Sequence, residues 1–216
     1  MPRLLRRRPL ERAIHTLVRG ERPVEAIVVT LHGGPERGFR RTAPWSAPYL
    51  RMIPFGRRVR ELSDERIAIV HLRHTQTGWN GGERTTVGQA RMLLAELARR
   101  EPTLPVGLLG HSLGGRTALA AAGYAHVTTV AALAPWVTPH DDVAHLIDRD
   151  VLIVQGDRDR MCPKPETDAF VERLRKAGGH PRYEVLEGCG HSMYRRAGEW
   201  HDIAASHLVR TLLPRG

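Results

Sequence analysis

Residues 110–114 read Gly-His-Ser-Leu-Gly and constrain the fold more than any other segment of the chain. They follow the apolar run 106–109 and precede the helix-like stretch 116–122, so Ser112 sits on a sharp turn between a strand and a helix. Such a turn brings the two backbones close together, and a side chain in place of either glycine is expected to collide with backbone. The turn therefore predicts a serine hydroxyl pushed out at the end of a sheet.

Strand-like and helix-like segments alternate along the rest of the chain. The strand-like runs are dense in valine, isoleucine and leucine with little alternation, as in strands that are covered on both faces. Strands that alternate with helices pair in parallel, with helices on both faces of the sheet. The chain is therefore predicted to be an α/β three-layer sandwich with about six strands, at residues 26–31, 67–72, 106–109, 127–133, 151–154 and 183–186. The helices are predicted within residues 45–62, 85–100, 113–125, 170–177 and 199–213.

The chain of 216 residues is predicted to form one domain, residues 23–216, after a basic extension, residues 1–22. The extension holds seven arginines and two glutamates, which is about half of the net charge of +10. Within it, residues 10–19 fit a helix and, nearly as well, a short edge strand. The remaining positive charge is spread over the chain, and few aromatic residues and no nucleic-acid motif accompany it, so no nucleic-acid partner is expected. A basic nucleic-acid-binding module is kept as a third alternative.

The cellular location is predicted from the cysteines and the apolar runs. No apolar run has the length of a transmembrane helix, and the basic start lacks the continuous apolar stretch of a signal peptide. Cys162 and Cys189 are the only cysteines, which suits a reducing compartment. A cytoplasmic protein without a transmembrane segment is therefore expected.

Three further groups of polar residues follow strand-like runs, as Ser112 does: residues 32–34 (His-Gly-Gly), 156–159 (Gly-Asp-Arg-Asp) and 190–192 (Gly-His-Ser). A serine becomes a nucleophile only beside a base and a third group that orients the base. An imidazole titrates near neutrality and suits the base. No spacing of histidines and carboxylates resembles a zinc site, so neither a metal nor an organic cofactor is expected.

The order serine, aspartate, histidine resembles the α/β-hydrolase family over residues 24–213. This resemblance implies that Ser112 is the nucleophile, His191 the general base and Asp159 the acid that orients the base. Either Asp157 or Asp159 could supply the acid, and the family's spacing between a glycine and a following proline selects Asp159. The alternative acids are residues 141 and 142, since some relatives draw the acid from there.

The resemblance also indicates an oxyanion hole and an acyl pocket. The oxyanion is expected to bind the backbone N–H groups of Leu113 and Gly34. Trp136, Met193 and Trp79 lie just after strand ends and are candidate walls of the acyl pocket, or equally half-buried packing residues. His32 in this motif braces the loop.

This chain is expected to be a shortened relative without a cap domain. Only residues 137–149 separate two strands where many relatives insert a cap, which is room for a loop and one short helix. The residues before 24 have room for at most a trace of the family's extra antiparallel strands. The active site is therefore expected to be open to solvent.

The predicted function is a serine hydrolase that cleaves a carboxylic ester of a small or medium acyl group through an acyl-enzyme. The partner is a small-molecule acyl substrate, and no oligomeric state is predicted. The alternatives are a thioesterase, amidase or perhydrolase on the same scaffold, or a non-catalytic binding module with this fold. Cys162 and Cys189 lie on the two loops that carry the acid and the base, so a redox-sensitive link between them is a further hypothesis.

Overall fold

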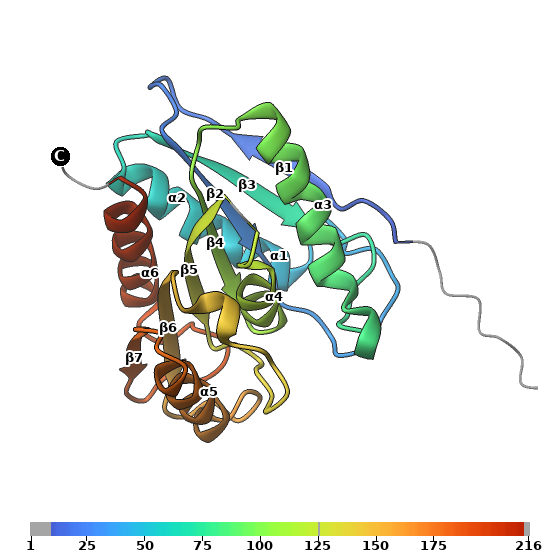
Figure 1. Ribbon diagram of the computed structural model, residues 1–216, viewed down its shortest axis with the longest axis vertical. Helices are drawn as coiled ribbons and strands as arrows, with labels where there is room; N and C mark the ends of the chain where they lie inside the picture. Colours follow the sequence, from blue (N-terminus) through green and yellow to red (C-terminus); the bar gives the residue numbers. More distant parts are fainter. Residues whose placement is uncertain (1–9, 125, 214–216) are drawn as a thin grey trace, which may run out of the picture.

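The computed structural model describes residues 10–124 and 126–213, and the arginines among residues 1–9 lie outside the described residues. Within this part, seven strands form one sheet in the order β1-β3-β2-β4-β5-β6-β7. Strands β2 to β7 are parallel, and β1 pairs with β3 in the antiparallel direction (Figure 1). The strands are β1 (Ile14–Val18), β2 (Ala26–Leu31), β3 (Ile67–Arg73), β4 (Val106–His111), β5 (Val127–Leu133), β6 (Asp150–Gly156) and β7 (Arg182–Leu186).

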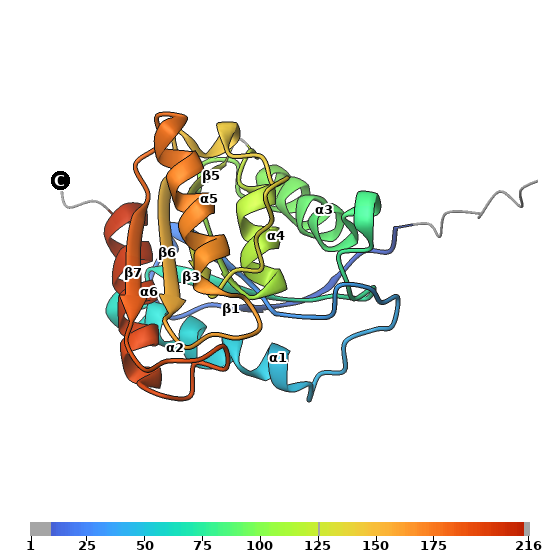
Figure 2. The same cartoon turned by 90° about the horizontal axis from the view of Figure 1, so that it is seen from below.

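The helices cover both faces of the sheet (Figure 2). Helices α3, α4 and α5 bury their apolar sides in one core, whose largest side chains include Leu108 and Phe170. Helices α2 and α6 bury theirs in a second core on the opposite face, around Phe55 and Trp200. The helices are α1 (Ala47–Leu50), α2 (Met52–Leu62), α3 (Thr85–Arg100), α4 (Leu113–Ala121), α5 (Lys164–Lys176) and α6 (Ala197–Leu212), with 3-10 turns η1 (Gly81–Glu83) and η2 (Ala144–Leu146).

This architecture confirms the predicted three-layer α/β fold, with β2 to β7 as the six expected strands. Residues 14–18 form the edge strand β1, so the helix considered for residues 10–19 is wrong and the alternative of a strand is right. β1 lies within the segment predicted as a basic extension, and it adds a seventh strand to the sheet. Four of its five residues are exposed, because β1 lies at the edge of the sheet and pairs with β3 alone.

No cap domain follows β5 in the described structure, as expected. Between β5 and β6 the chain forms a loop whose only helical part is η2. The loop is fastened to α4 by Arg116, which donates two hydrogen bonds to Asp141, and to α5 by Arg173, which donates to two backbone carbonyls of the loop. Of the described helices, none combines the length and the apolar composition needed to cross a bilayer.

The turn between β4 and α4 has the sharp geometry that its sequence predicts. Ser112 has φ 57° and ψ −121°, a conformation that side chains rarely adopt. A Cβ at Gly110 would overlap the Gly114 carbonyl, and one at Gly114 would overlap the Leu31 carbonyl. The two glycines therefore let α4 begin directly against the ends of β2 and β4.

Two buried histidines fix the loop after β2. His32 Nδ1 lies 2.7 Å from the Gly33 carbonyl oxygen, and the His74 backbone N–H donates to His32 Nε2 at 3.2 Å. Because one ring nitrogen faces a carbonyl and the other an N–H, His32 is held as the neutral tautomer with its proton on Nδ1. Burial lowers the pKa of His32 to about 4 and that of His74 to about 3.

The Gly114→Ala variant is expected to lose about 3 kcal/mol of unfolding free energy or more. Its methyl group would meet backbone atoms of Leu31 and His32, which cannot rotate away as a side chain could. Urea denaturation measures the loss. The control is Gly123→Ala, where the new methyl group would make only ordinary contacts with His145 and stability should hold or rise. Equal stability of both variants would contradict the close approach.

Stability is expected to fall as the pH decreases from about 6.5 to about 4. In this range the unfolded chain protonates His32 and His74, while their lowered pKa keeps both rings neutral in the folded chain. The loss from His32 alone is on the order of 3 kcal/mol. Urea denaturation at several pH values should show a shallower pH dependence for His32→Gln. The exposed His140→Gln variant is the control and should keep the slope.

Candidate active site

Three side chains from three loops form one chain of hydrogen bonds at the carboxyl edge of the sheet. His191 Nε2 lies 3.0 Å from Ser112 Oγ, and His191 Nδ1 lies 2.8 Å from Asp159 Oδ2. Ser112 precedes α4, Asp159 follows β6 and His191 follows β7. The aspartate side chain is fully buried and the histidine side chain is 10% exposed, so the pair is largely shielded from water. The structure thus brings together the serine, histidine and aspartate that the sequence singled out.

The Asp159 carboxylate is held on both oxygens. Oδ1 accepts hydrogen bonds from the backbone N–H groups of Met161 and Cys162, and Oδ2 accepts one from the Gln155 side chain at 3.3 Å. Although burial opposes it, the hydrogen bonds from His191 and from the two backbone amides hold the pKa of Asp159 below its ordinary value. The group is therefore a fixed anion that faces Nδ1 of the histidine.

The other candidate acids have different partners. Asp157 is exposed, and its backbone N–H donates to the Leu186 carbonyl. Asp141 pairs with Arg116, and Asp142 accepts a hydrogen bond from the Ala144 N–H. The geometry therefore singles out Asp159 as the carboxylate that hydrogen-bonds His191.

A second histidine holds the loop of His191. His111 Nε2 lies 2.9 Å from the His191 carbonyl oxygen, and the two rings lie 4.8 Å apart. Burial, assisted by the neighbouring His191, lowers the pKa of His111 to about 3, so this ring is neutral and donates from Nε2. Gln155 was not identified from the sequence, because nothing marks a buried glutamine on a strand as a carboxylate partner.

The loop after β2 lies against the serine turn. A Cβ placed on Gly33 would stand 3.3 Å from Ser112 Cβ, and one on Gly34 would stand 3.4 Å from the Leu113 side chain. Within the described residues, no hydrogen bond occupies the N–H of Gly34 or that of Leu113. Two adjacent, unoccupied backbone donors beside a serine hydroxyl are what an oxyanion requires.

The two cysteines are buried free thiols, so the hypothesised link between them is not formed. Cys189 Sγ lies 3.5 Å from the Arg195 carbonyl oxygen, whereas Cys162 Sγ lies within 4.8 Å of ligand atoms of Asp159 and His191. Burial raises the pKa of Cys162 to about 12, so the thiol stays protonated. Atoms of Cys162, Asp159 and His191 that could ligate a metal ion lie within 4.8 Å of one another. Asp159 and His191, however, already hydrogen-bond each other.

An apolar cavity of about 360 Å³ begins at Ser192 and Met193, the residues that follow His191. Met193, a predicted wall of the acyl pocket, lines this cavity. Arg51 and Tyr194 lie at its exposed side, with a hydrogen bond of 3.1 Å between them. The walls come from α1, α2 and the start of α6, and include Leu50, Pro54, Phe55, Met193, Ala197 and His201.

The other two predicted walls, Trp136 and Trp79, lie elsewhere. The Arg116 guanidinium is stacked between them, 3.8 Å from the centre of the Trp79 ring and 4.7 Å from that of Trp136. Neither tryptophan lines the apolar cavity, because both pack on the α4 side of the sheet. Because both tryptophans follow strand ends, the sequence predicted correctly that they lie at the carboxyl edge of the sheet. It could not predict which face of the sheet they pack on.

Comparison with known proteins agrees with this geometry. The dienelactone hydrolase family matches residues 57–211, which is more than half of the chain. No sequence among the curated proteins matches the chain significantly.

Solved structures show the same fold at low identity. An α/β serine hydrolase without a lid from Xanthomonas campestris has a TM-score of 0.70 and 16% identity, over 97% of this chain and 100% of that chain. An α/β serine hydrolase homologue from Coxiella burnetii has a TM-score of 0.69 and 17% identity, over 90% of each chain. The butyrate-bound esterase Est2 from Thermogutta terrifontis has a TM-score of 0.70 and 13% identity, over 94% of this chain and 91% of that chain. The protein therefore belongs to the dienelactone hydrolase family and is an α/β hydrolase that acts on ester bonds.

Proposed function

We propose that this hydrolase cleaves carboxylic esters with a small or medium acyl group, through an acyl-enzyme formed on Ser112. The observation that carries the proposal is the hydrogen-bond chain from Ser112 through His191 to Asp159. In the proposed reaction Ser112 is the nucleophile, His191 is the general base, and Asp159 is the anion that orients the base. The backbone N–H groups of Gly34 and Leu113 are the proposed donors for the oxyanion.

The first half of the reaction follows from the tautomer of His191. Asp159 accepts a hydrogen bond from the Nδ1–H group, which keeps that proton on Nδ1 and leaves the Nε2 lone pair free to take the proton of the Ser112 hydroxyl. Oγ then attacks the ester carbonyl carbon, and the carbonyl oxygen becomes an oxyanion bound by the N–H groups of Leu113 and Gly34. His191 returns the proton to the alcohol, which leaves as the C–O bond breaks.

The second half repeats these steps with water. His191 takes a proton from the water, whose oxygen attacks the acyl carbon on Ser112. The second oxyanion collapses, the proton goes back to Oγ, and the carboxylic acid leaves. Asp159 stays ionised throughout and stabilises the imidazolium that forms twice in the cycle.

The apolar cavity beside Met193 is proposed to hold the acyl chain. It starts directly after His191, and its walls are mostly carbon, with Phe55 and Leu50 among them. Its volume of about 360 Å³ lies at the lower end of the range for small-molecule sites, which favours short chains. The structural neighbour Est2 holds butyrate, an acyl group of this class.

The location proposed for this hydrolase is the cytoplasm. The support is that Cys162 and Cys189 are both free thiols, a state that reducing compartments maintain.

Labelling with a fluorophosphonate probe tests the proposed nucleophile. The probe should modify Ser112, as located by peptide mapping, and the Ser112→Ala variant should not react. Modification of another serine, or no reaction of folded protein that still hydrolyses 4-nitrophenyl acetate, would overturn the assignment.

The Asp159→Asn variant is expected to lower kcat for 4-nitrophenyl butyrate by about 10⁴-fold, because the amide no longer fixes the proton of His191 on Nδ1. Steady-state kinetics measure the effect, and circular dichroism verifies folding. The matched control is Asp157→Asn, which removes the same charge two residues away on an exposed side chain and should keep kcat. Comparable losses in both variants would contradict the role of Asp159.

Ala197→Trp is expected to shorten the acyl chain that the enzyme accepts. The indole would fill the apolar cavity and exclude two methylene groups of a butyryl chain, at about 0.8 kcal/mol each. The ratio of kcat/KM for butyrate to that for acetate should therefore fall about tenfold. Ala120→Trp, which fills a different cavity, is the control and should leave the ratio unchanged. An unchanged ratio in Ala197→Trp would place the acyl chain elsewhere.

A further inference from the structure

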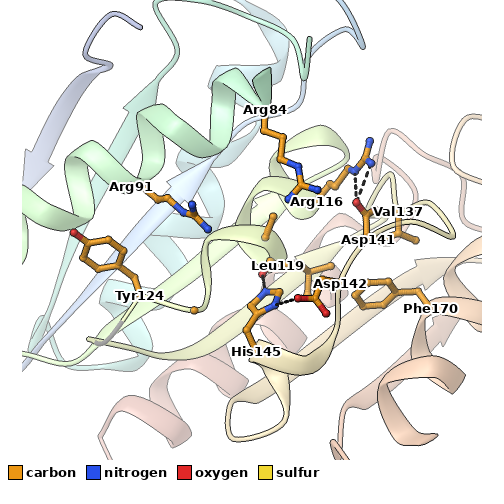
Figure 3. Close-up of a pocket in the computed structure, with 12 residues that line it drawn as sticks. Arg84, Arg91, Arg116, Leu119, Tyr124, Val137, Asp141, Asp142, His145 and Phe170 are labelled. Atoms are coloured by element: carbon orange, nitrogen blue, oxygen red, sulfur yellow. Dashed lines mark hydrogen bonds and ion pairs between the residues drawn. The ribbon is translucent and has the colours of Figure 1, made fainter. Parts of the chain in front are cut away.

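A second cavity lies over α4, away from the serine site (Figure 3). Its volume is also about 360 Å³, and its walls come from α3, α4, α5 and the loop between β5 and β6. It shares no lining residue with the apolar cavity, and neither Ser112, Asp159 nor His191 faces it. Its chemistry is therefore independent of the proposed hydrolysis.

Three arginines line this cavity: Arg84, Arg91 and Arg116. Arg84 directly precedes α3 and Arg91 lies in its second turn; both are exposed, with their guanidinium groups directed toward the cavity in Figure 3. Among the described residues, neither has a carboxylate partner, and the Arg84 guanidinium lies 5.9 Å from the centre of the Trp79 ring. The two guanidinium groups are thus available to a ligand.

The two carboxylates of the cavity are already engaged. Asp141 accepts hydrogen bonds from Arg116 on one oxygen and from the Thr138 N–H on the other, so this ion pair is internally balanced. Asp142 accepts from the Ala144 N–H, which lowers its pKa, and it lies beside His145 on the wall opposite α3. His145 is itself bound to the Leu119 carbonyl at 2.8 Å. The uncompensated charge of the cavity is therefore positive and concentrated at Arg84 and Arg91.

The floor of the cavity is apolar, with Leu119, Val137 and Phe170 among its residues. We propose that this cavity binds a small organic anion, whose carboxylate or phosphate lies between Arg84 and Arg91 and whose apolar body packs on this floor. Guanidinium groups bind both kinds of anion through paired, charge-assisted hydrogen bonds. The negative Asp142 on the far wall fixes the orientation, because it repels an anionic group placed at that end.

Calorimetric titration with three ligands of one shape tests the proposal. Phenylacetate and phenyl phosphate carry the two candidate anions, and phenylacetamide is the neutral counterpart of phenylacetate. At least one anion should bind at least about tenfold more tightly than the amide, which corresponds to a charge-assisted hydrogen bond. The comparison of the two anions decides between a carboxylate and a phosphate ligand. Equal binding of all three ligands, or no binding, would overturn the proposal.

Variants locate the bound anion. The double variant Arg84→Gln, Arg91→Gln should weaken binding about five- to tenfold. The expected effect is modest because both side chains are exposed and water screens their charge. Arg99→Gln removes a charge from an exposed position of the same helix and should leave the affinity unchanged. Ala120→Trp fills the cavity and should abolish binding. An equal loss of affinity in Arg99→Gln and in the double variant would refute the site, and so would retained binding in Ala120→Trp. These binding measurements do not depend on whether Ser112 is the nucleophile.

Discussion

The close approach of α4 to the end of β2 is the contact on which the serine site depends. With hydrogen in place of a side chain, Gly114 lies against the Leu31 carbonyl, and Gly110 lies against the backbone of Gly114. This contact forces Ser112 into its left-handed conformation and turns its hydroxyl out of the sheet. It also sets the Leu113 N–H beside the loop after β2, so one backbone constraint places both the serine and the proposed oxyanion donors.

The loop after β5 is held against α4 and α5 by hydrogen bonds from Arg116 and Arg173. Arg116, one turn after Ser112, is 8% exposed and lies between two tryptophan rings. Asp141 cancels its charge through two hydrogen bonds, and removal of that carboxylate would leave a buried guanidinium without a counter-ion. The stack and the ion pair together hold the loop over α4 without enclosing Ser112.

Much of the fold and of the candidate site was predictable because the signals are local. Parallel strands end at one edge of the sheet, so polar residues after strand ends predicted that Ser112, Asp159 and His191 would meet there. The edge strand β1 was ambiguous because an exposed strand lacks the continuous apolar run that marked the other six. The sequence could not show that Trp79 and Trp136 contact Arg116 and do not line the apolar cavity, because spacing does not specify the side of the sheet and this contact depends on packing between distant segments.

The two cavities differ in the chemistry of the side chains that line them. The cavity next to His191 is lined mainly by carbon, with Arg51 at its exposed side, so burial of apolar surface is the interaction it offers to the proposed acyl chain. The cavity over α4 is lined by the guanidinium groups of Arg84, Arg91 and Arg116, and Arg116 also contacts the rings of Trp79 and Trp136. Of the charged groups at the two sites, only Asp159 hydrogen-bonds His191, so it is the charge that stabilises the imidazolium in the proposed reaction.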